Sequence, residues 1–254
     1  MALMLRRMEQ AVAKDLTPEH SHDPDAIRER LRDGHRINYI SNWIYGGIDG
    51  AITTFAIVAG SLGAELSGRV VLILGMANIL ADGFSMAAAN FAGTRADEDV
   101  ARELRRVEER HIRVTPRGEM EEVRQIFAAK GFSGQVLEEI VEVITADKER
   151  WIETMMAEEY GITPVRKSAW LAAILTFTGF LICGVVPLLP FMLNMPYTAE
   201  VSVVMTACVF IAIGIAKSKW SPMKWWQSGL ETLTIGLIAA GMAYGIGDFL
   251  NRFI

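Results

Sequence analysis

Five stretches of this sequence are each long and apolar enough to cross a lipid bilayer, and they limit most strongly what the chain can fold into. A helix needs about 20 mainly apolar residues to span the hydrocarbon core. Within that core only helices and closed barrels satisfy every backbone polar group. The stretches lie at about 43–64, 70–93, 168–192, 198–217 and 229–252. With 51% hydrophobic residues overall, the chain is predicted to be an all-α membrane protein with five transmembrane helices.

A charged segment separates the second stretch from the third. Residues 94–167 contain about half of the Lys and Arg residues and most of the acids, whereas the stretches on either side are sparse in charge. The predicted parts are an N-terminal tail with a candidate interfacial helix at 1–42, transmembrane helices 1 and 2 at 43–93, a charged helical domain at 94–167, and transmembrane helices 3 to 5 at 168–254.

The charged segment is predicted to be helical throughout. No helix breaker follows the second span, so that helix is expected to continue through His111. Pro116 then starts a helix to about Lys130, GFSG makes a turn, and a last helix is expected from Gln135 to Tyr160. We therefore expect a three-helix domain inserted between transmembrane helices 2 and 3.

Positive charge is placed asymmetrically around the spans. Lys and Arg residues close to a span tend to stay on the cytoplasmic side. They gather before span one, at the end of the charged segment, and between spans four and five, as Arg28, Arg30, Arg32, Arg36, Arg166, Lys167, Lys217, Lys219 and Lys224. The N-terminus and the charged domain are therefore predicted to be cytoplasmic. No organelle address is evident, and the short ends and loops favour a bacterial cytoplasmic membrane over a vacuole.

Other features narrow the class of partner. A net charge of −5 offers no basic surface for nucleic acid. Cys183 and Cys208 both fall inside apolar stretches, so we expect neither a disulfide framework nor a zinc site built on cysteines. Small residues, as in Gly241-x-x-x-Gly245, let membrane helices approach closely, either within one chain or at the seam of a homodimer.

Ionisable residues inside the spans are candidates for a translocation path. Asp82 lies four positions after Asn78 and four before Met86, so an amide, a carboxylate and a thioether share one helix stripe. Asp49 lies near the cytoplasmic end of span one, between glycines. A charge inside the bilayer is costly and indicates function by default, with a hydrogen-bonded packing role for Asp82 as the alternative.

Acids in the charged segment recur at helical spacing. The pairs that share a helix face are Glu108 with His111, Glu119 with Glu122, and Met155 with Glu159. Together these groups suit a divalent first-row metal such as Fe²⁺, Mn²⁺ or Co²⁺ better than Ca²⁺. The alternative is a solvated acidic surface. Glu108-x-x-His111 also matches half of a di-iron carboxylate motif, so a ferritin-like oxidase is a minor alternative.

Several motifs together resemble one known family. They are YGGIDGAITTFAIVAGSLGA and GMANILADGFSMAAANFAG in spans one and two, WIETMMAEEYGI at the end of the charged segment, and GLETLTIGLIAAGMAYGIG in span five. The sequence is similar to the vacuolar iron transporter family over essentially everything after residue 40. The resemblance implies a five-span homodimer that moves Fe²⁺, and in some members Mn²⁺, out of the cytoplasm in exchange for protons. It also implies that the domain between spans two and three is a cytoplasmic metal-binding domain.

The resemblance also implies roles for individual residues. The family's translocation carboxylate corresponds to Asp49 and its span-two methionine to Met86. Its metal-binding residues in the domain correspond to Glu108, Glu119, Glu122, Met155, Met156 and Glu159. This chain departs from the family pattern at two positions where a glutamate is expected. Asn78 stands where plant-type members have a glutamate in span two, and Asp82, one turn later, is the expected substitute. His111 stands where the family has a fourth glutamate in the metal-binding domain.

These observations predict a proton-coupled exporter, an antiporter, of divalent metal. Fe²⁺ is the expected cargo, with Mn²⁺, Co²⁺ and Zn²⁺ as further candidates. The translocation path is predicted at Asp49, Asp82, Met86 and Asn78. The alternatives are a membrane-anchored iron-binding or ferroxidase-like protein, and a channel-like or signalling protein that metal regulates. The leading interpretation is not an enzyme, and its partners are metal ions, protons, the lipid bilayer and a second copy of the chain.

Overall fold

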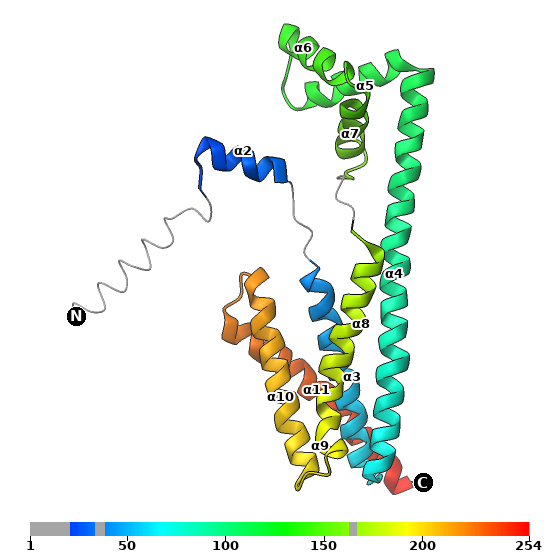
Figure 1. Ribbon diagram of the computed structural model, residues 1–254, viewed down its shortest axis with the longest axis vertical. Coiled ribbons are helices and arrows are strands. Elements are labelled where there is room, and N and C mark those ends of the chain that lie inside the picture. The colour runs from blue at the N-terminus through cyan, green and yellow to red at the C-terminus, as the bar shows by residue number, and fades with distance from the viewer. Residues whose placement is uncertain (1–20, 34–38, 163–166, 254) are drawn as a thin grey trace, which may run out of the picture. The chain divides into compact units, whose positions relative to one another are not determined.

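The computed structural model describes residues 21–33, 39–162 and 167–253, and all regular structure in these ranges is helical (Figure 1). The predicted all-α class is confirmed. Five helical segments are long and apolar enough to cross a membrane, as predicted. They are α3 (Ile40–Gly63), α4 (Gly68–Val114), α8 with its continuation (Ala169–Met192), α10 with the short η2 (Thr198–Trp220) and α11 (Trp225–Phe253).

The chain divides after residue 37 into two units. The first contains α2 (Pro24–Asp33), which covers Ile27 and Leu31 of the candidate interfacial helix. The remainder of that prediction at 34–38, and the tail at 1–20, lie outside the described residues. A position of α2 on a membrane surface therefore stays a prediction.

The regular helix of the third span ends just before two prolines. The helix α8 (Ala169–Val185) passes into η1 (Val186–Leu188) and then α9 (Leu189–Met192). Pro187 and Pro190 occupy the first turns of these two short helices. Proline is tolerated in a first turn because the amide it lacks has no partner there, but in a helix interior it breaks the ladder.

Helix α3 is central among the spans, because it packs against α4, α8, α10 and α11. Its glycines allow α8 to approach at backbone distance. A Cβ on Gly46 would lie 2.1 Å from the carbonyl oxygen of Thr176, and one on Gly50 would lie 2.4 Å from that of Phe180. The small face of α3 therefore serves packing within the chain. In contrast, within the described residues no atom lies within 4 Å of a Cβ built on Gly241 or Gly245.

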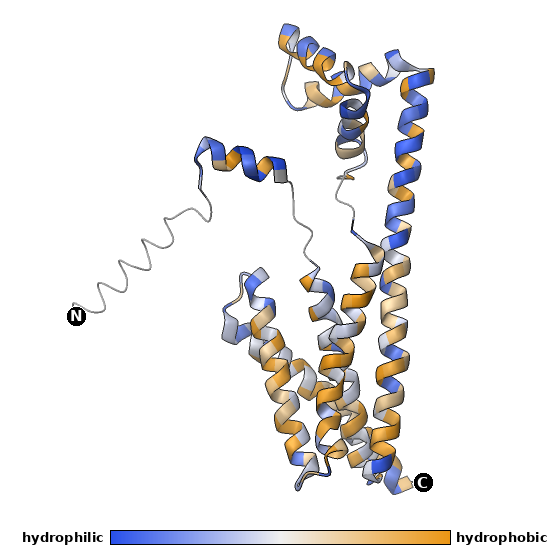
Figure 2. Ribbon diagram, in the orientation of Figure 1, coloured by the Kyte–Doolittle hydropathy of each residue, from blue (hydrophilic) through white to orange (hydrophobic). Residues whose placement is uncertain are grey.

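Helix α4 runs unbroken for 47 residues, so its predicted continuation through His111 is confirmed. At a rise of 1.5 Å per residue it is about 70 Å long. That is about twice the thickness of a bilayer's hydrocarbon core. Figure 2 shows α4 changing along its length from mainly hydrophobic to mainly hydrophilic. The same helix therefore extends from the apolar spans into the charged segment.

Three further helices follow α4, namely α5 (Pro116–Ala129), α6 (Gly134–Thr145) and α7 (Lys148–Glu158). The prediction of a single helix from Gln135 to Tyr160 is wrong, because Asp147 separates α6 from α7. The backbone of Asp147 is extended, and its carboxylate accepts a hydrogen bond of 2.8 Å from the amide of Arg150. Asp147 thus caps the N-terminus of α7.

The break between α6 and α7 lets both helices contribute to one apolar core. Val141 and Ile144 of α6 are buried together with Trp151 and Met155 of α7 and Val123 of α5. In one straight helix Trp151 would lie about 15 Å along the axis from Val141, whereas the break lets α7 pack against α6. On which side of a membrane these helices lie stays a prediction.

Candidate metal centre

The candidate centre forms where α4 reverses into α5. Glu108 and His111 lie three positions apart near the end of α4 and therefore share a helix face. Helix α4 ends at Val114, and Pro116 begins α5 almost at once. Glu119 lies in the first turn of α5. The tight reversal therefore brings Glu119 back toward Glu108 and His111.

Three side chains converge there to form what we call the domain cluster, Glu108, His111 and Glu119. Nδ1 of His111 lies 3.3 Å from Oε1 of Glu119 and 4.0 Å from Oε1 of Glu108. One ligand atom from each residue lies within 4.8 Å of the other two. Two carboxylates and an imidazole at these separations can converge on one divalent first-row ion.

Both carboxylates of the domain cluster are buried, with Glu108 0% and Glu119 3% exposed. The hydroxyl of Tyr160, which follows α7, donates a hydrogen bond of 2.9 Å to Oε1 of Glu108. Oε2 of Glu108 and Oε2 of Glu119 have no hydrogen-bond partner in the described part of the chain. A buried carboxylate is unfavourable unless a cation or a proton neutralises it. The donor set and its unpartnered oxygens thus fit a bound cation.

The carboxyl groups around the cluster influence one another's ionisation. Burial raises the pKa of Glu119 to about 7, and the negative charges of Glu108 and Glu122 add to the rise. Partial burial of the Glu159 carboxyl group also raises its pKa, again with contributions from Glu108 and Glu122. Near neutral pH, Glu119 is therefore divided between a protonated form and an ionised form that can accept a metal ion.

The other four predicted ligands of the domain lie outside the cluster. Glu122 and Glu159 are exposed, although their charges act on it. Met155 and Met156 are buried, and Met155 packs in the apolar core beside Val123. The structure therefore brings together Glu108, His111 and Glu119, and coordination by these four residues stays a prediction.

The predicted membrane residues lie on α3 and α4. Asp49 and Met86 are half-buried and Asp82 is exposed. Nδ2 of Asn78 donates a hydrogen bond of 3.3 Å to Oγ1 of Thr53, whose hydroxyl donates one of 2.9 Å to the carbonyl oxygen of Asp49. A polar connection thus joins α4 to α3 beside what we call the membrane pair, Asp49 and Asp82.

Sequence reasoning missed several polar residues near these groups. Nδ2 of Asn90 donates a hydrogen bond of 2.6 Å to Oγ1 of Thr176 on α8, and the hydroxyl of Thr94 donates one of 3.4 Å to Oδ1 of Asn90. Asn90 and Thr94 continue the i, i+4 series of the predicted path, so the sequence contained that signal. Tyr160 had no such signal, because its partner Glu108 lies 52 positions earlier.

Comparisons with known proteins provide an independent line of evidence. A family model described as the VIT family matches residues 40–248. A vacuolar iron transporter of Toxoplasma gondii is 30% identical over 258 residues, which cover 92% of this chain and 83% of that protein. Vacuolar iron transporter 1 of Arabidopsis thaliana is 32% identical over 214 residues, covering 82% and 85%. Vacuolar iron transporter 1 of Eucalyptus grandis is 31% identical over 230 residues, covering 86% and 92%.

Proposed function

The chain belongs to the VIT family, a family of iron transporters rather than enzymes, and from this premise we propose that it exports Fe²⁺ from the cytoplasm in exchange for protons. One observation carries the proposal. The single helix α4 holds part of a buried acidic cluster near one end and a carboxylate, Asp82, within its apolar part. A metal-collecting domain and a membrane path would thus be joined by one rigid element.

Capture is proposed to occur at the domain cluster. Glu108 and Glu119 would supply carboxylate oxygens and His111 an imidazole nitrogen to Fe²⁺. Glu122, Glu159, Met155 and Met156 are proposed as further ligands or as groups that raise the local metal concentration. Because these acids must lose protons before they bind metal, capture would release protons into the cytoplasm.

Passage through the membrane is proposed to follow the membrane pair. Asp49 and Asp82 would receive the ion, with the thioether of Met86 and the amide oxygen of Asn78 as neutral ligands. Protons arriving from the far side would compete for the same carboxylates. Protonation would then release the ion, and deprotonation would prepare the pair for the next one.

A homodimer is part of the proposal, because a single chain leaves Asp82 exposed within an apolar span. A carboxylate facing lipid at the centre of a span costs about 2.5–3.5 kcal/mol on insertion scales. A second copy could cover Asp82 and enclose the path. The open faces at Gly241 and Gly245 also suit close approach of a neighbouring helix.

The proposed orientation places the N-terminus and the charged domain in the cytoplasm. The distribution of Lys and Arg around the spans supports it. We propose the bacterial cytoplasmic membrane as the location. Mn²⁺, Co²⁺ and Zn²⁺ are proposed as additional ions, since carboxylate and imidazole ligands accept all of them and affinity order alone does not select iron.

Transport in liposomes tests the proposal. Purified protein is reconstituted in vesicles with a more acidic interior, and Fe²⁺ entry and interior pH are followed with trapped dyes. The account predicts Fe²⁺ uptake that raises the interior pH and stops when an ionophore collapses the gradient. Asp49→Asn should abolish this uptake, whereas Asp248→Asn, an acid paired with Arg252 on α11, should not. Uptake that ignores the gradient would refute antiport, and normal uptake by Asp49→Asn would refute the path.

A further inference from the structure

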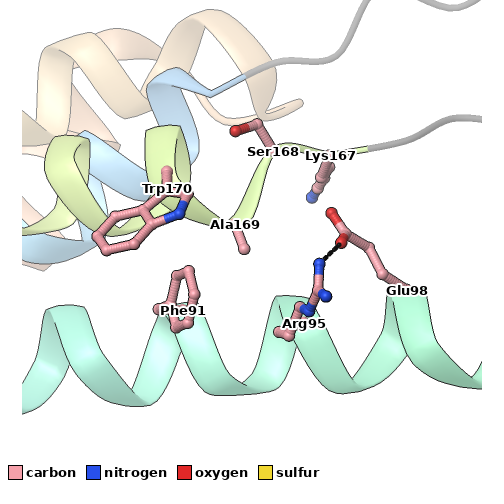
Figure 3. A pocket seen from close by; sticks show the side chains of 7 residues that line it. All are labelled: Phe91, Arg95, Glu98, Lys167, Ser168, Ala169 and Trp170. Carbon is pink, nitrogen blue, oxygen red and sulfur yellow. Dashed lines mark hydrogen bonds and ion pairs between the residues drawn. The ribbon is translucent and has the colours of Figure 1, made fainter.

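A pocket of about 590 Å³ lies between α4 and the start of α8, formed by residues other than those of the two acidic groups (Figure 3). Helix α4 contributes an aromatic ring, a cation and an acid to the pocket. The start of α8 and the residues just before it contribute a lysine, the N-cap serine of α8 and a tryptophan. The lining residues are Phe91, Arg95, Glu98, Lys167, Ser168, Ala169 and Trp170.

The pocket lies where apolar helix gives way to charged helix. Helix α8 begins at Ala169, and along α4 the residues change from apolar to charged at Arg95. Trp170 is 70% exposed, and its ring centroid lies 4.7 Å from that of Phe91. Tryptophan is enriched at the boundary between membrane and water. The aromatic wall of the pocket therefore belongs at the depth of lipid headgroups and glycerol.

The cations of the pocket differ in how they are neutralised. Nη1 of Arg95 lies 3.2 Å from Oε2 of Glu98, and its Nε lies 3.8 Å from Oδ1 of Asp99. Lys167 forms no ion pair with any residue that the structure describes. Figure 3 shows its side chain extending from the α8 side toward Arg95 and Glu98. Lys167 therefore adds a positive charge to a pocket whose one lining acid, Glu98, is already paired with Arg95.

We propose that this pocket binds an anionic phospholipid, with Lys167 and Arg95 holding the phosphate oxygens and with Phe91 and Trp170 contacting the glycerol and the upper acyl chains. Basic pockets between membrane helices bind acidic headgroups, and cations at such a pocket make charge-assisted hydrogen bonds to phosphate. A soluble phosphate compound would use the cations but would gain little from an aromatic wall at the bilayer surface. The proposal does not depend on which ion is transported.

A bound lipid would connect two elements at a sensitive point. Lys167 is the last residue of the charged domain at 94–167, and α4 is the helix that enters that domain. A phosphate held between Lys167 and Arg95 would link two parts of the chain. Arg95 lies on α4, the helix that enters the charged domain, and Lys167 lies where the chain leaves that domain. The lipid would thus fix the junction between the domain and the spans.

Native mass spectrometry of the full-length protein in detergent tests the proposal, with short-chain phosphatidylglycerol as the probe and phosphatidylcholine as the uncharged comparison. One surface cation is worth about a fivefold change in affinity for anionic lipid. Lys167→Ala should therefore weaken phosphatidylglycerol binding about fivefold, and Trp170→Ala should weaken it at least as much. Lys224→Ala, which removes an exposed lysine between α10 and α11, is the matched control and should bind like the unmodified chain. Lys167→Arg keeps the charge and should also bind normally.

Competition with inorganic phosphate separates a lipid from a free anion. The proposal predicts that millimolar phosphate does not displace phosphatidylglycerol, because it cannot use the aromatic wall. Unchanged phosphatidylglycerol affinity in Lys167→Ala or in Trp170→Ala overturns the proposal, and so does displacement by inorganic phosphate. Circular dichroism of each variant checks that helix content is retained.

Discussion

The domain cluster and the membrane pair are two acidic groups on the same long helix, and they differ in how completely one chain encloses them. Glu108 and Glu119 are buried and lie beside His111 within a single chain. Asp49 is half-buried, and Asp82 is exposed. The first group could hold a metal ion within one chain. We propose that the second lies on the path of the ion, and a single chain does not enclose it.

The difference has an energetic basis. In the domain cluster, Oε2 of Glu108 and Oε2 of Glu119 are buried and accept no hydrogen bond from any described residue, which makes a bound cation or proton favourable. In the membrane pair, tight enclosure around a fixed ion would slow its release. An open pair that exchanges protons for metal suits turnover better. We therefore expect damage to the cluster to change metal affinity, and damage to the pair to change flux.

Removing a ligand from the domain cluster should give the largest effect. Glu119→Ala in the full-length protein is expected to weaken Fe²⁺ binding more than about 100-fold, because a change in a residue that only orients a ligand already costs about 10- to 100-fold. Titration calorimetry under anaerobic conditions measures it. Glu139→Ala, an exposed acid of α6, is the control. If Glu119→Ala binds normally, the cluster does not hold the ion.

A change near the membrane pair should act on stability and flux rather than on binding. Gly50→Ala would place a Cβ 2.4 Å from the carbonyl oxygen of Phe180, forcing α3 away from α8. Overpacking of this kind typically destabilises by about 1–3 kcal/mol. Thermal unfolding in detergent should show the loss, whereas Gly93→Ala, whose added Cβ would meet no described residue within 4 Å, should not lower the stability. Equal behaviour of the two variants would contradict the packing account.

Tyr160→Phe should have a smaller effect, confined to the domain cluster. The substitution removes the hydroxyl that donates a hydrogen bond of 2.9 Å to Oε1 of Glu108, but it keeps the aromatic ring. Because Tyr160 orients a ligand and is not one, Fe²⁺ affinity should fall about tenfold while maximal flux through the membrane pair is retained. Parallel calorimetry and vesicle assays measure the two quantities. A loss of flux without a loss of affinity would assign Tyr160 a different role.

The pH dependence of binding should give the smallest effect. With the pKa of Glu119 at about 7, its ionised fraction, and with it Fe²⁺ affinity, should fall about threefold between pH 7.5 and 6.5. Without metal, the stability of the folded chain should change with pH in the opposite direction to Fe²⁺ affinity. The chain should lose stability as the pH rises from 4.5 toward 7, because the unfolded chain releases this proton first. Glu119→Gln should remove both trends, and an unchanged pH profile in that variant would place the titrating group elsewhere.

Much of the fold could be predicted from the sequence, because membrane spans depend on length and composition. The five spans, the continuity of α4 and the breaks at Pro187 and Pro190 all follow from local rules. The break at Asp147 could not be predicted in the same way. Neither glycine nor proline marks it, and the one local signal is Asp147 as an N-cap. The core that α6 and α7 share exists only in the folded domain.

In the candidate sites, too, contacts within one helix could be predicted from the sequence, and contacts between helices could not. Glu108 and His111 could be paired by spacing because they lie on one helix, and Asn90 could have been found by extending the same periodicity along α4. The approach of Glu119 depends on the reversal at Pro116, and the contact of Tyr160 depends on the return of the chain after α7. Exposure is equally invisible in a sequence, so nothing local indicated that Glu108 would be buried and Asp82 exposed.

The central claim is that the two acidic groups divide the work, with the domain cluster binding the ion and the membrane pair moving it. Asp82→Asn tests it most directly when Fe²⁺ binding and proton-linked Fe²⁺ flux are measured on the same preparation. The account predicts that calorimetric binding at the domain cluster stays unchanged and that flux into acidic vesicles is abolished. Flux at the rate of the unmodified chain, or a loss of binding equal to that of Glu119→Ala, would contradict it.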